Sequence, residues 1–337
     1  MFRMLSATVV ALAMMLGASA RAQTLPKPGD KPIRVTFLHV NDIHGHTDLY
    51  NINGHSVGGY PRLATAVQAA RAEKSADRIF LIHAGDEFSL HTVGEPSPGE
   101  KLTTSTKGAA NVALMNQIGF DLWTPGNGEF YGGLGLLKQR FSEFRGQTLS
   151  ANLYSRLDGK LLFKPYIIQE VRGLRIAFFS VNFIHEKYPT CLMIRMENPI
   201  ETAKKLVPEL RQQADFVVAV THIGLDADRQ LAQSVDGIDL IIGGHSHSVL
   251  PNGTATKSPD GQDVVIAQAG EYLNYLGRVD LEVARTADGW EIQTLAPTLT
   301  KLDEKVQIDP TVKATIAKLS ATTRAATPQL VPAGQVD

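Results

Sequence analysis

The sequence contains one cysteine in 337 residues, Cys191, so the chain cannot form an internal disulfide bond. A lone cysteine of this kind is more typical of a small apolar core residue than of a nucleophile. Net charge is also nearly absent, because 33 Lys and Arg residues stand against 34 Asp and Glu residues. This balance does not supply the basic face that a nucleic-acid polymer requires. Without a disulfide bond, the fold must be held by an apolar core. The near-zero net charge does not exclude a small anionic ligand, which needs only a local positive charge.

Long apolar runs are missing, apart from a short one near the N-terminus. Residues 9–16 are apolar, follow Arg3, and precede the small-residue sequence Ala20-Arg21-Ala22. A membrane-spanning helix needs about 20 apolar residues, whereas this arrangement is typical of a secretory signal peptide. We therefore predict a signal peptide over residues 1–22, cleavage after Ala22, and a periplasmic or secreted protein with no membrane span.

Apolar periodicity predicts alternating strands and helices over most of the chain. Because alternation favours parallel sheet and the later hairpins favour antiparallel pairs, we predict an α/β fold, a layered sandwich with mixed sheets. The predicted helices are 60–74, 108–118, 134–144, 200–213, 226–235 and 309–323, and the predicted strands are 33–40, 78–83, 121–124, 148–151, 166–171, 174–181, 216–220, 238–242, 264–267, 276–283 and 290–295.

Two histidines follow the apolar run 238–242, in the sequence Gly243-Gly244-His245-Ser246-His247. On an extended backbone, side chains two residues apart point the same way, so His245 and His247 could serve one metal cluster. The two glycines would let another segment of backbone approach closely.

Four other predicted strands also end in polar residues of the kind that bind metal ions. In open α/β sheets, ligands gather outside the carboxyl ends of the strands. Carboxylates, an amide and imidazoles together suit two adjacent transition-metal ions, and the set is too rich in nitrogen for magnesium or calcium alone. The absence of thiolates also excludes a structural zinc site. The candidate metal ligands are Asp42, His44, Asp86, Asn127, His222, His245 and His247.

In these motifs the sequence resembles the calcineurin-like metallophosphoesterases, and within them the exported 5′-nucleotidase and 2′,3′-cyclic phosphodiesterase branch. The resemblance extends from about Val35 to Leu302 and implies a four-layer α-β-β-α sandwich. The motifs that carry it are Asn41-Asp42-Ile43-His44-Gly45, Gly85-Asp86, Gly126-Asn127, Ser150-Ala151-Asn152-Leu153, Thr221-His222 and Gly243-Gly244-His245-Ser246-His247.

The resemblance implies two divalent metal ions. It does not decide whether they are manganese, zinc or iron. It implies that Asp86 bridges them and that Asn127 also contacts the substrate during catalysis. Two metals roughly 4 Å apart can bind phosphoryl oxygens and stabilise an in-line attack on phosphorus. The implied ligands are Asp42, His44, Asp86 and His247 for one ion, and Asp86, Asn127, His222 and His245 for the other.

The sequence departs from the family at the catalytic dyad. The family has a histidine after the asparagine ligand and an aspartate three residues further on, whereas this chain has Gly128 and Tyr131. General acid catalysis is worth roughly 10²–10⁴-fold, so esters with poor leaving groups should suffer most. His46 and His91 are the candidates nearest in sequence to replace the missing general acid, and Tyr131 is a weaker candidate. For each of the three, the alternative is an ordinary solvated loop residue without a catalytic role.

A second departure concerns length and base recognition. We predict one metallophosphoesterase domain over 33–303, followed at 304–337 by a C-terminal helix and a mobile tail, with the relatives' second nucleotidase domain absent. Nucleotide preference is then unsupported. Arg62 occupies a position similar to one that the family fills with arginine, so it is a candidate for substrate binding, although a structural ion pair is as plausible.

The predicted function is a periplasmic dinuclear phosphoesterase that hydrolyses small phosphate esters or anhydrides, with activity reduced by the missing dyad. Two alternatives stay open: a metal- and phosphate-binding protein without turnover, and a sulfur-ester hydrolase similar to exported thiosulfohydrolases. The expected partner is a small phosphorylated substrate and no nucleic-acid polymer, and the oligomeric state is not predicted.

Overall fold

A computed structural model of the protein describes residues 26–88 and 100–326. The predicted signal peptide, His91 and the predicted tail from residue 327 onward lie outside the described residues. Within the described residues, no helix combines the length and the apolar character needed to cross a membrane.

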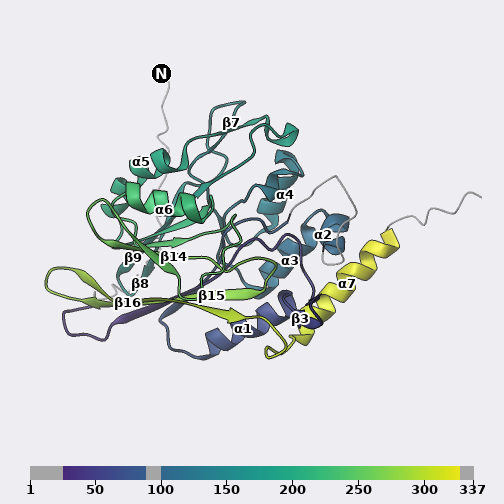
Figure 1. The fold of residues 1–337 in the computed structure, drawn as a ribbon, viewed down its shortest axis with the longest axis horizontal. Coiled ribbons are helices and arrows are strands. Elements are labelled where there is room, and N and C mark those ends of the chain that lie inside the picture. The colour runs from purple at the N-terminus through teal and green to yellow at the C-terminus, as the bar shows by residue number, and fades with distance from the viewer. Residues whose placement is uncertain (1–25, 89–99, 327–337) are drawn as a thin grey trace, which may run out of the picture.

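Two six-stranded mixed sheets form the centre of the fold (Figure 1). The first contains, in spatial order, β16 (Trp290–Lys301), β15 (Tyr275–Arg285), β1 (Ile33–Val40), β4 (Arg78–His83), β5 (Leu122–Trp123) and β6 (Gln147–Thr148). Strands β1, β4, β5 and β6 are parallel, and β15 and β16 add an antiparallel edge.

The second sheet contains, in spatial order, β13 (Thr254–Lys257), β14 (Asp263–Ala267), β12 (Leu240–Ile242), β11 (Phe216–His222), β9 (Leu174–Asn182) and β8 (Tyr166–Val171). Its four central strands are parallel and its two outer strands are antiparallel to their neighbours. Two small ribbons complete the strands: β2 (Tyr50–Ile52) with β3 (His55–Val57), and β7 (Leu153–Ser155) with β10 (Ile194–Met196).

Helices cover the outer faces of both sheets, which gives four layers (Figure 1). The first sheet packs on α1 (Tyr60–Ala72), α3 (Ala109–Ile118), α4 (Leu134–Glu143) and α7 (Pro310–Ala326), and the second on α5 (Pro199–Arg211) and α6 (Leu225–Ser234). The short helix α2 (Lys101–Thr106) precedes α3. Single 3₁₀ turns occupy Gly128–Phe130 and Pro189–Cys191.

Strand β1 shows why the layers form, because both of its faces are buried over most of its length. Phe37 faces the second sheet, and its ring lies 6.0 Å from that of Phe178 and 6.1 Å from that of Phe216. Leu38 and Val40 point the other way, into the core beneath the helices. A strand that is buried on both faces is the pattern expected of a central parallel strand.

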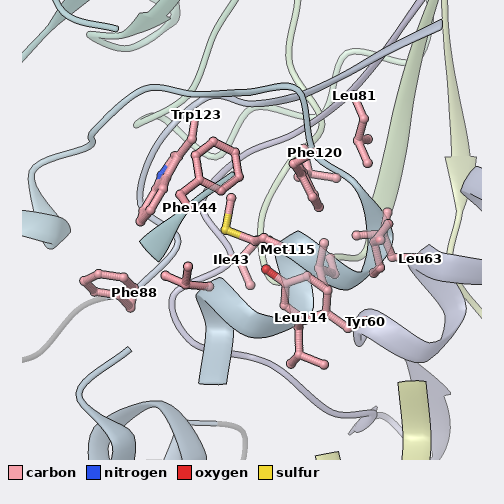
Figure 2. Close-up of a cluster of buried hydrophobic side chains, with 14 of the residues drawn as sticks. Ile43, Tyr60, Leu63, Leu81, Phe88, Leu114, Met115, Phe120, Trp123 and Phe144 are labelled. Atoms are coloured by element: carbon pink, nitrogen blue, oxygen red, sulfur yellow. The ribbon is translucent and has the colours of Figure 1, made fainter. Parts of the chain in front are cut away.

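The core between the first sheet and its helices is rich in aromatic side chains (Figure 2). The Trp123 ring packs edge-on against that of Phe144 at 5.6 Å, and Tyr60 and Phe88 are fully buried in the same cluster. These residues flank the loops that follow β4 and β5. The loops therefore leave the sheet from a rigid base.

The predicted α/β sandwich with mixed sheets is confirmed, and most long elements agree within a few residues, whereas β16 extends six residues beyond its predicted end at residue 295. Sequence analysis missed the short elements β2, β3, α2, β7, β10 and β13, which lack a full period of apolar residues. Helix α7 buries Val312 and Ile316 in the same core as α1 and α3. The domain boundary at residue 303 stays a prediction.

Candidate metal centre

The candidate metal ligands converge at the carboxyl ends of strands from both sheets. Asp42 and His44 follow β1, Asp86 follows β4, and Asn127 follows β5 in the first sheet. The second sheet contributes three imidazoles: His222 is the last residue of β11, and His245 and His247 follow β12. Segments separated by up to 205 positions in sequence thus meet at one edge of the sandwich.

The first group of ligand-type side chains consists of Asp42, His44 and His247, and one ligand atom from each lies within 4.8 Å of the others. His247 Nε2 is 3.0 Å from His44 Nε2 and 3.3 Å from Asp42 Oδ1. His44 Nε2 is 3.7 Å from the same oxygen. We call these three residues the first group.

The second group consists of Asp86, His222 and His245, which meet the same 4.8 Å criterion. His222 Nε2 lies 3.4 Å from Asp86 Oδ2. That carboxylate oxygen is also 3.8 Å from His44 Nε2 of the first group. Asp86 therefore faces both groups, which is the position a bridging carboxylate requires.

Three buried atoms at this edge make no hydrogen bond: Asn127 Oδ1, Asp42 Oδ1 and His222 Nε2. The last two make only ion-pair contacts, the shortest at 3.3 Å to His247 and 3.4 Å to Asp86. A buried polar atom without a partner is costly, so such atoms are rare in folded proteins. All three are atom types that coordinate divalent transition metals. The residues present therefore fit a pair of metal ions, which would satisfy the three atoms together.

Further contacts fix the ligand atoms in position. His222 Nδ1 bonds to the Ala84 carbonyl at 2.7 Å, and His247 Nδ1 bonds to Glu271, so each ring presents Nε2 to the site. Asp42 Oδ2 accepts hydrogen bonds from the Asn41 amide at 2.6 Å and the His245 backbone N–H at 2.8 Å. Such outer contacts orient metal ligands and are a regular part of metal sites.

The segment that replaces the family's dyad supports its neighbours. The Gly128 backbone N–H donates to Asp86 Oδ1 at 2.6 Å, which leaves Oδ2 for the site. The Asn127 side-chain N–H donates to the Tyr131 hydroxyl at 3.0 Å, and the amide oxygen is left buried without a hydrogen-bond partner. Gly128 and Tyr131 thus orient two candidate ligands.

Sequence analysis missed Glu129, whose buried carboxylate organises this segment. It accepts backbone hydrogen bonds from Gly126, Asp86, Glu87 and Phe88 at 2.6–3.2 Å. Burial and the charge of Asp86 raise the pKa of Glu129 to about 8, and the N–H donors oppose this shift. The one sequence signal for Glu129 was its position two residues after the candidate ligand Asn127. No periodic pattern predicts that a buried carboxylate will accept backbone hydrogen bonds from other loops.

Charges at the site stabilise one another. Burial alone would raise the pKa of Asp86, but the charges of His222 and His44 and the Gly128 N–H outweigh it and lower that pKa. Burial would likewise lower the pKa of His222, and the carboxylates of Asp86 and Asp42 instead raise it to about 10. In the absence of metal, His222 therefore carries the positive charge that these two carboxylates need.

Five of the candidate ligands have left-handed backbone, with φ of 52° at Asp42, 49° at His44, 57° at Asp86, 78° at His245 and 53° at His247. Residues other than glycine rarely adopt this conformation, and functional sites are where it concentrates. The extended backbone predicted for His245 and His247 is therefore wrong, because β12 has already ended. The two rings enter different groups of the same cluster, His247 the first and His245 the second, as the implied ligand sets assign them.

Gly244 confirms the prediction of close backbone approach. A Cβ atom placed there would lie 2.5 Å from the Ala84 carbonyl oxygen and 2.8 Å from His222 Nδ1. The hydrogen bond between those two groups therefore passes directly beneath Gly244. A side chain at this position would force the second sheet's loop away from the first sheet.

The other candidate residues lie at the margin of the site or outside the described residues. His46 bonds through Nδ1 to the Ile43 carbonyl at 3.1 Å and stacks on Tyr272, with the ring centroids 4.2 Å apart. Arg62 is buried and donates to the Val306 carbonyl and the Ser56 hydroxyl, which fits a structural role. The catalytic prediction for His46 and the substrate-binding prediction for Arg62 stay untested, as does that for His91.

Known 5′-nucleotidases are similar to this chain in sequence. The chain is 28% identical to a probable 5′-nucleotidase of Treponema pallidum over 280 residues, which cover 75% of this chain and 45% of that protein. It is 28% identical to the 5′-nucleotidase of Bos taurus over 323 residues, covering 86% and 53%. The chain thus spans about half the length of the curated relatives it matches.

Solved structures share the fold. A 5′-nucleotidase precursor from Thermus thermophilus superposes with a TM-score of 0.74 at 26% identity, covering 87% of this chain and 59% of that one. A sulfate thiohydrolase, SoxB, also from Thermus thermophilus, superposes at 0.73 with 20% identity, covering 89% and 62%, a likeness that shows the fold alone. Residues 35–249 match the family model described as calcineurin-like phosphoesterase, so the chain belongs to the calcineurin-like phosphoesterase family.

Proposed function

We propose that this protein is a phosphoesterase that uses two divalent metal ions to hydrolyse small phosphate esters or anhydrides. The observation that carries the proposal is that six candidate ligands form two groups at one edge of the sandwich. A seventh, Asn127, precedes the residue that bonds to Asp86, and its buried amide oxygen has no hydrogen-bond partner. One ion would be held by Asp42, His44, Asp86 and His247. The other would be held by Asp86, Asn127, His222 and His245.

When bound, the two ions would supply Lewis-acid stabilisation of the charge on a phosphoryl group. The protein's contribution is to hold its ligand atoms in place before substrate arrives. Glu271 and the Ala84 carbonyl fix two imidazole rings, and the Gly128 N–H fixes the Asp86 carboxylate. Tyr131 holds the Asn127 amide, whose oxygen can face both an ion and a phosphoryl group.

The segment after Asn127 determines which esters react well. Gly128 has no side chain that could protonate a leaving group, and Tyr131 stands where the family has the supporting aspartate. Esters whose leaving groups need little protonation should therefore react fastest, and alkyl esters slowest. The 5′-nucleotidase relatives favour a nucleotide-like substrate class, and the N-terminal pattern of residues 1–22 favours export to the periplasm or beyond.

The test is a reconstitution series. Protein stripped with EDTA is loaded with manganese, zinc or ferrous iron, and assayed with bis(4-nitrophenyl) phosphate, 4-nitrophenyl phosphate and AMP while bound metal is counted by mass spectrometry. We expect about two ions per chain and metal-dependent hydrolysis. Asp86→Ala should lower both, whereas Asp288→Ala, which removes the same charge from the exposed turn between β15 and β16, should change neither. Hydrolysis that survives Asp86→Ala unchanged would refute the proposal.

A second candidate is a metal- and phosphate-binding protein without turnover, and the replacement of the dyad by Gly128 and Tyr131 favours it. The same series separates the two. Two bound ions with no hydrolysis of the nitrophenyl esters, whose leaving groups need no acid, would favour the binding protein.

A further inference from the structure

A row of aromatic rings begins at the carboxyl end of β9, next to the second group. Strand β9 pairs in parallel with β11, and Asn182 stands opposite His222. The backbone N–H of the next residue, Phe183, donates to the His222 carbonyl at 2.9 Å. The Phe183 ring centroid lies 5.3 Å from that of His245 and 5.0 Å from that of His185. Another strand end of the second sheet therefore reaches the site, although it carries no ligand motif.

The row continues and closes on the other side of the second group. The His185 ring lies 6.2 Å from that of Tyr188, which lies 4.9 Å from that of Tyr131. Tyr131 in turn accepts the hydrogen bond from Asn127. Both ends of the row thus rest on candidate ligands of the second metal. We call Phe183, His185, Tyr188 and Tyr131 the aromatic wall.

The wall presents ring surface to solvent. Tyr188 is 44% exposed and His185 is also exposed. Leu192 and Met193, in the same segment, are 59% and 43% exposed. Clustered exposed apolar surface of this kind marks binding sites, and aromatic faces favour planar partners over saturated ones.

We propose that the aromatic wall binds a planar ring in the organic group of the substrate, such as a phenyl ring or a nucleobase. This inference rests on the proposed function only for the position of the phosphate, at the two metal-ligand groups. Tyr131 links the two parts, because one hydroxyl group orients Asn127 while its ring belongs to the wall. The residue that departs from the family's dyad thereby contributes to substrate selection.

The test uses two phosphonates, one with a planar aromatic ring and one with a puckered saturated ring. Benzylphosphonate and cyclohexylmethylphosphonate have similar size and the same charge, and neither can be hydrolysed at the phosphorus–carbon bond. Calorimetry with the manganese-loaded protein should show that the benzyl compound binds about 2- to 12-fold more tightly. Tyr188→Ala should abolish this preference, and Tyr188→Phe should retain it.

Leu157→Ala is the control, since it removes a side chain that is 78% exposed on a neighbouring loop without touching the wall. It should leave the preference intact. Circular dichroism checks that each variant is folded, and Tyr188→Leu, which keeps apolar volume without a ring, should behave like Tyr188→Ala. Equal binding of the two phosphonates, or a preference that survives both Tyr188→Ala and Tyr188→Leu, would overturn the inference.

The outcome is independent of turnover. Ring-selective binding by a protein that hydrolyses no ester would support the wall and contradict the proposed function. Hydrolysis of esters without ring selectivity would do the opposite.

Discussion

The two groups of candidate ligands differ in how deeply they are set and in what holds them. In the first group, the side chains of His247 and His44 are 33% and 17% exposed, and a surface glutamate, Glu271, orients His247. In the second group, His222 is fully buried and Asp86 is 3% exposed. Asp42 of the first group is also fully buried and His245 of the second is only partly buried, so the contrast lies between the His44–His247 pair and the His222–Asp86 pair. Backbone groups of the opposite sheet and of the next loop, the Ala84 carbonyl and the Gly128 N–H, hold that second pair.

Because of this difference, we expect the two proposed metal sites to differ in rigidity and in how fast they exchange their ions. Buried ligands held by backbone cannot relax without moving a strand end, so the second site should be rigid and retain its ion. Ligands oriented by an exposed side chain can move independently, so the first site should exchange its ion more readily.

Replacing His222 should destabilise the protein far more than replacing His247. His222→Ala removes the positive charge between two buried carboxylates, Asp42 and Asp86, and should lower the free energy of unfolding by about 3–5 kcal/mol. His247→Ala acts on a partly exposed ring and should cost only about 1 kcal/mol or less. Urea denaturation of both variants and the wild type, with EDTA present, provides the comparison.

His55→Ala serves as the control, because the side chain is 74% exposed and lies outside both groups. Its unfolding midpoint should match that of the wild type. Equal losses in His222→Ala and His247→Ala would contradict the contrast in burial between the two groups.

Restoring a histidine beside the second group should raise activity on poor leaving groups. Gly128 lies in a 3₁₀ turn, whose backbone conformation other residues adopt without strain. Gly128→His should increase the hydrolysis of alkyl phosphates by about 10²-fold, at the lower end for a general acid because Tyr131 replaces the supporting aspartate. Rates with 4-nitrophenyl esters should change little, since that leaving group needs no acid.

Gly128→Ala is the matched control, and it should give no gain with either class of ester. A variant Gly128→His that leaves alkyl phosphates unaffected would show that the space beside Asn127 no longer admits a productive imidazole.

The layers of the fold and the positions of several candidate ligands could be predicted from sequence, because they depend on the order of residues within short segments. Asp42, Asp86 and His222 each lie within three residues of the end of a strand, and parallel strands bring their carboxyl ends to one edge. The alternation of strands and helices likewise predicted the layers. These features depend only on periodicity and on where each run stops.

Other features depend on contacts between distant segments and leave no periodic trace. The left-handed backbone at His245 and His247 follows from loops that must fit against the first sheet, and no residue type there announces it. Glu129 acts on backbone N–H groups more than forty residues away in sequence. The aromatic wall exists because β9 pairs with β11, a neighbour relation that the sequence does not specify.

Neutralising Glu271 should weaken the first site alone. Glu271→Gln keeps the size of the side chain but removes the charge that orients and polarises His247, so the affinity of one of two metal ions should fall about tenfold. Titration of EDTA-stripped protein with manganese, followed by electron paramagnetic resonance, resolves the two affinities. Glu291→Gln, an exposed change on β16, should alter neither. A loss of affinity at both sites would show that the two groups are not independently held.

The smallest effect should come from Asp228, a buried acid on α6 that backs the second group and accepts a hydrogen bond from the Thr221 hydroxyl at 2.6 Å. Burial raises the pKa of Asp228 to about 7, from about 3.9 in the unfolded chain. Folding therefore favours the protonated acid, and the stability it contributes at low pH is lost as pH rises through 7. Asp228→Asn cannot lose a proton. Its free energy of unfolding, relative to that of the wild type, should therefore rise by roughly 1 kcal/mol between pH 6 and pH 7.

Urea denaturation at both pH values measures this difference. Asp226→Asn is the control, because the Asp226 side chain is 92% exposed on the same helix, and it should show no such rise. A difference between wild type and Asp228→Asn that does not change with pH would mean that Asp228 stays ionised in the folded protein, and the second group would then rest on a buried charge instead of a neutral acid.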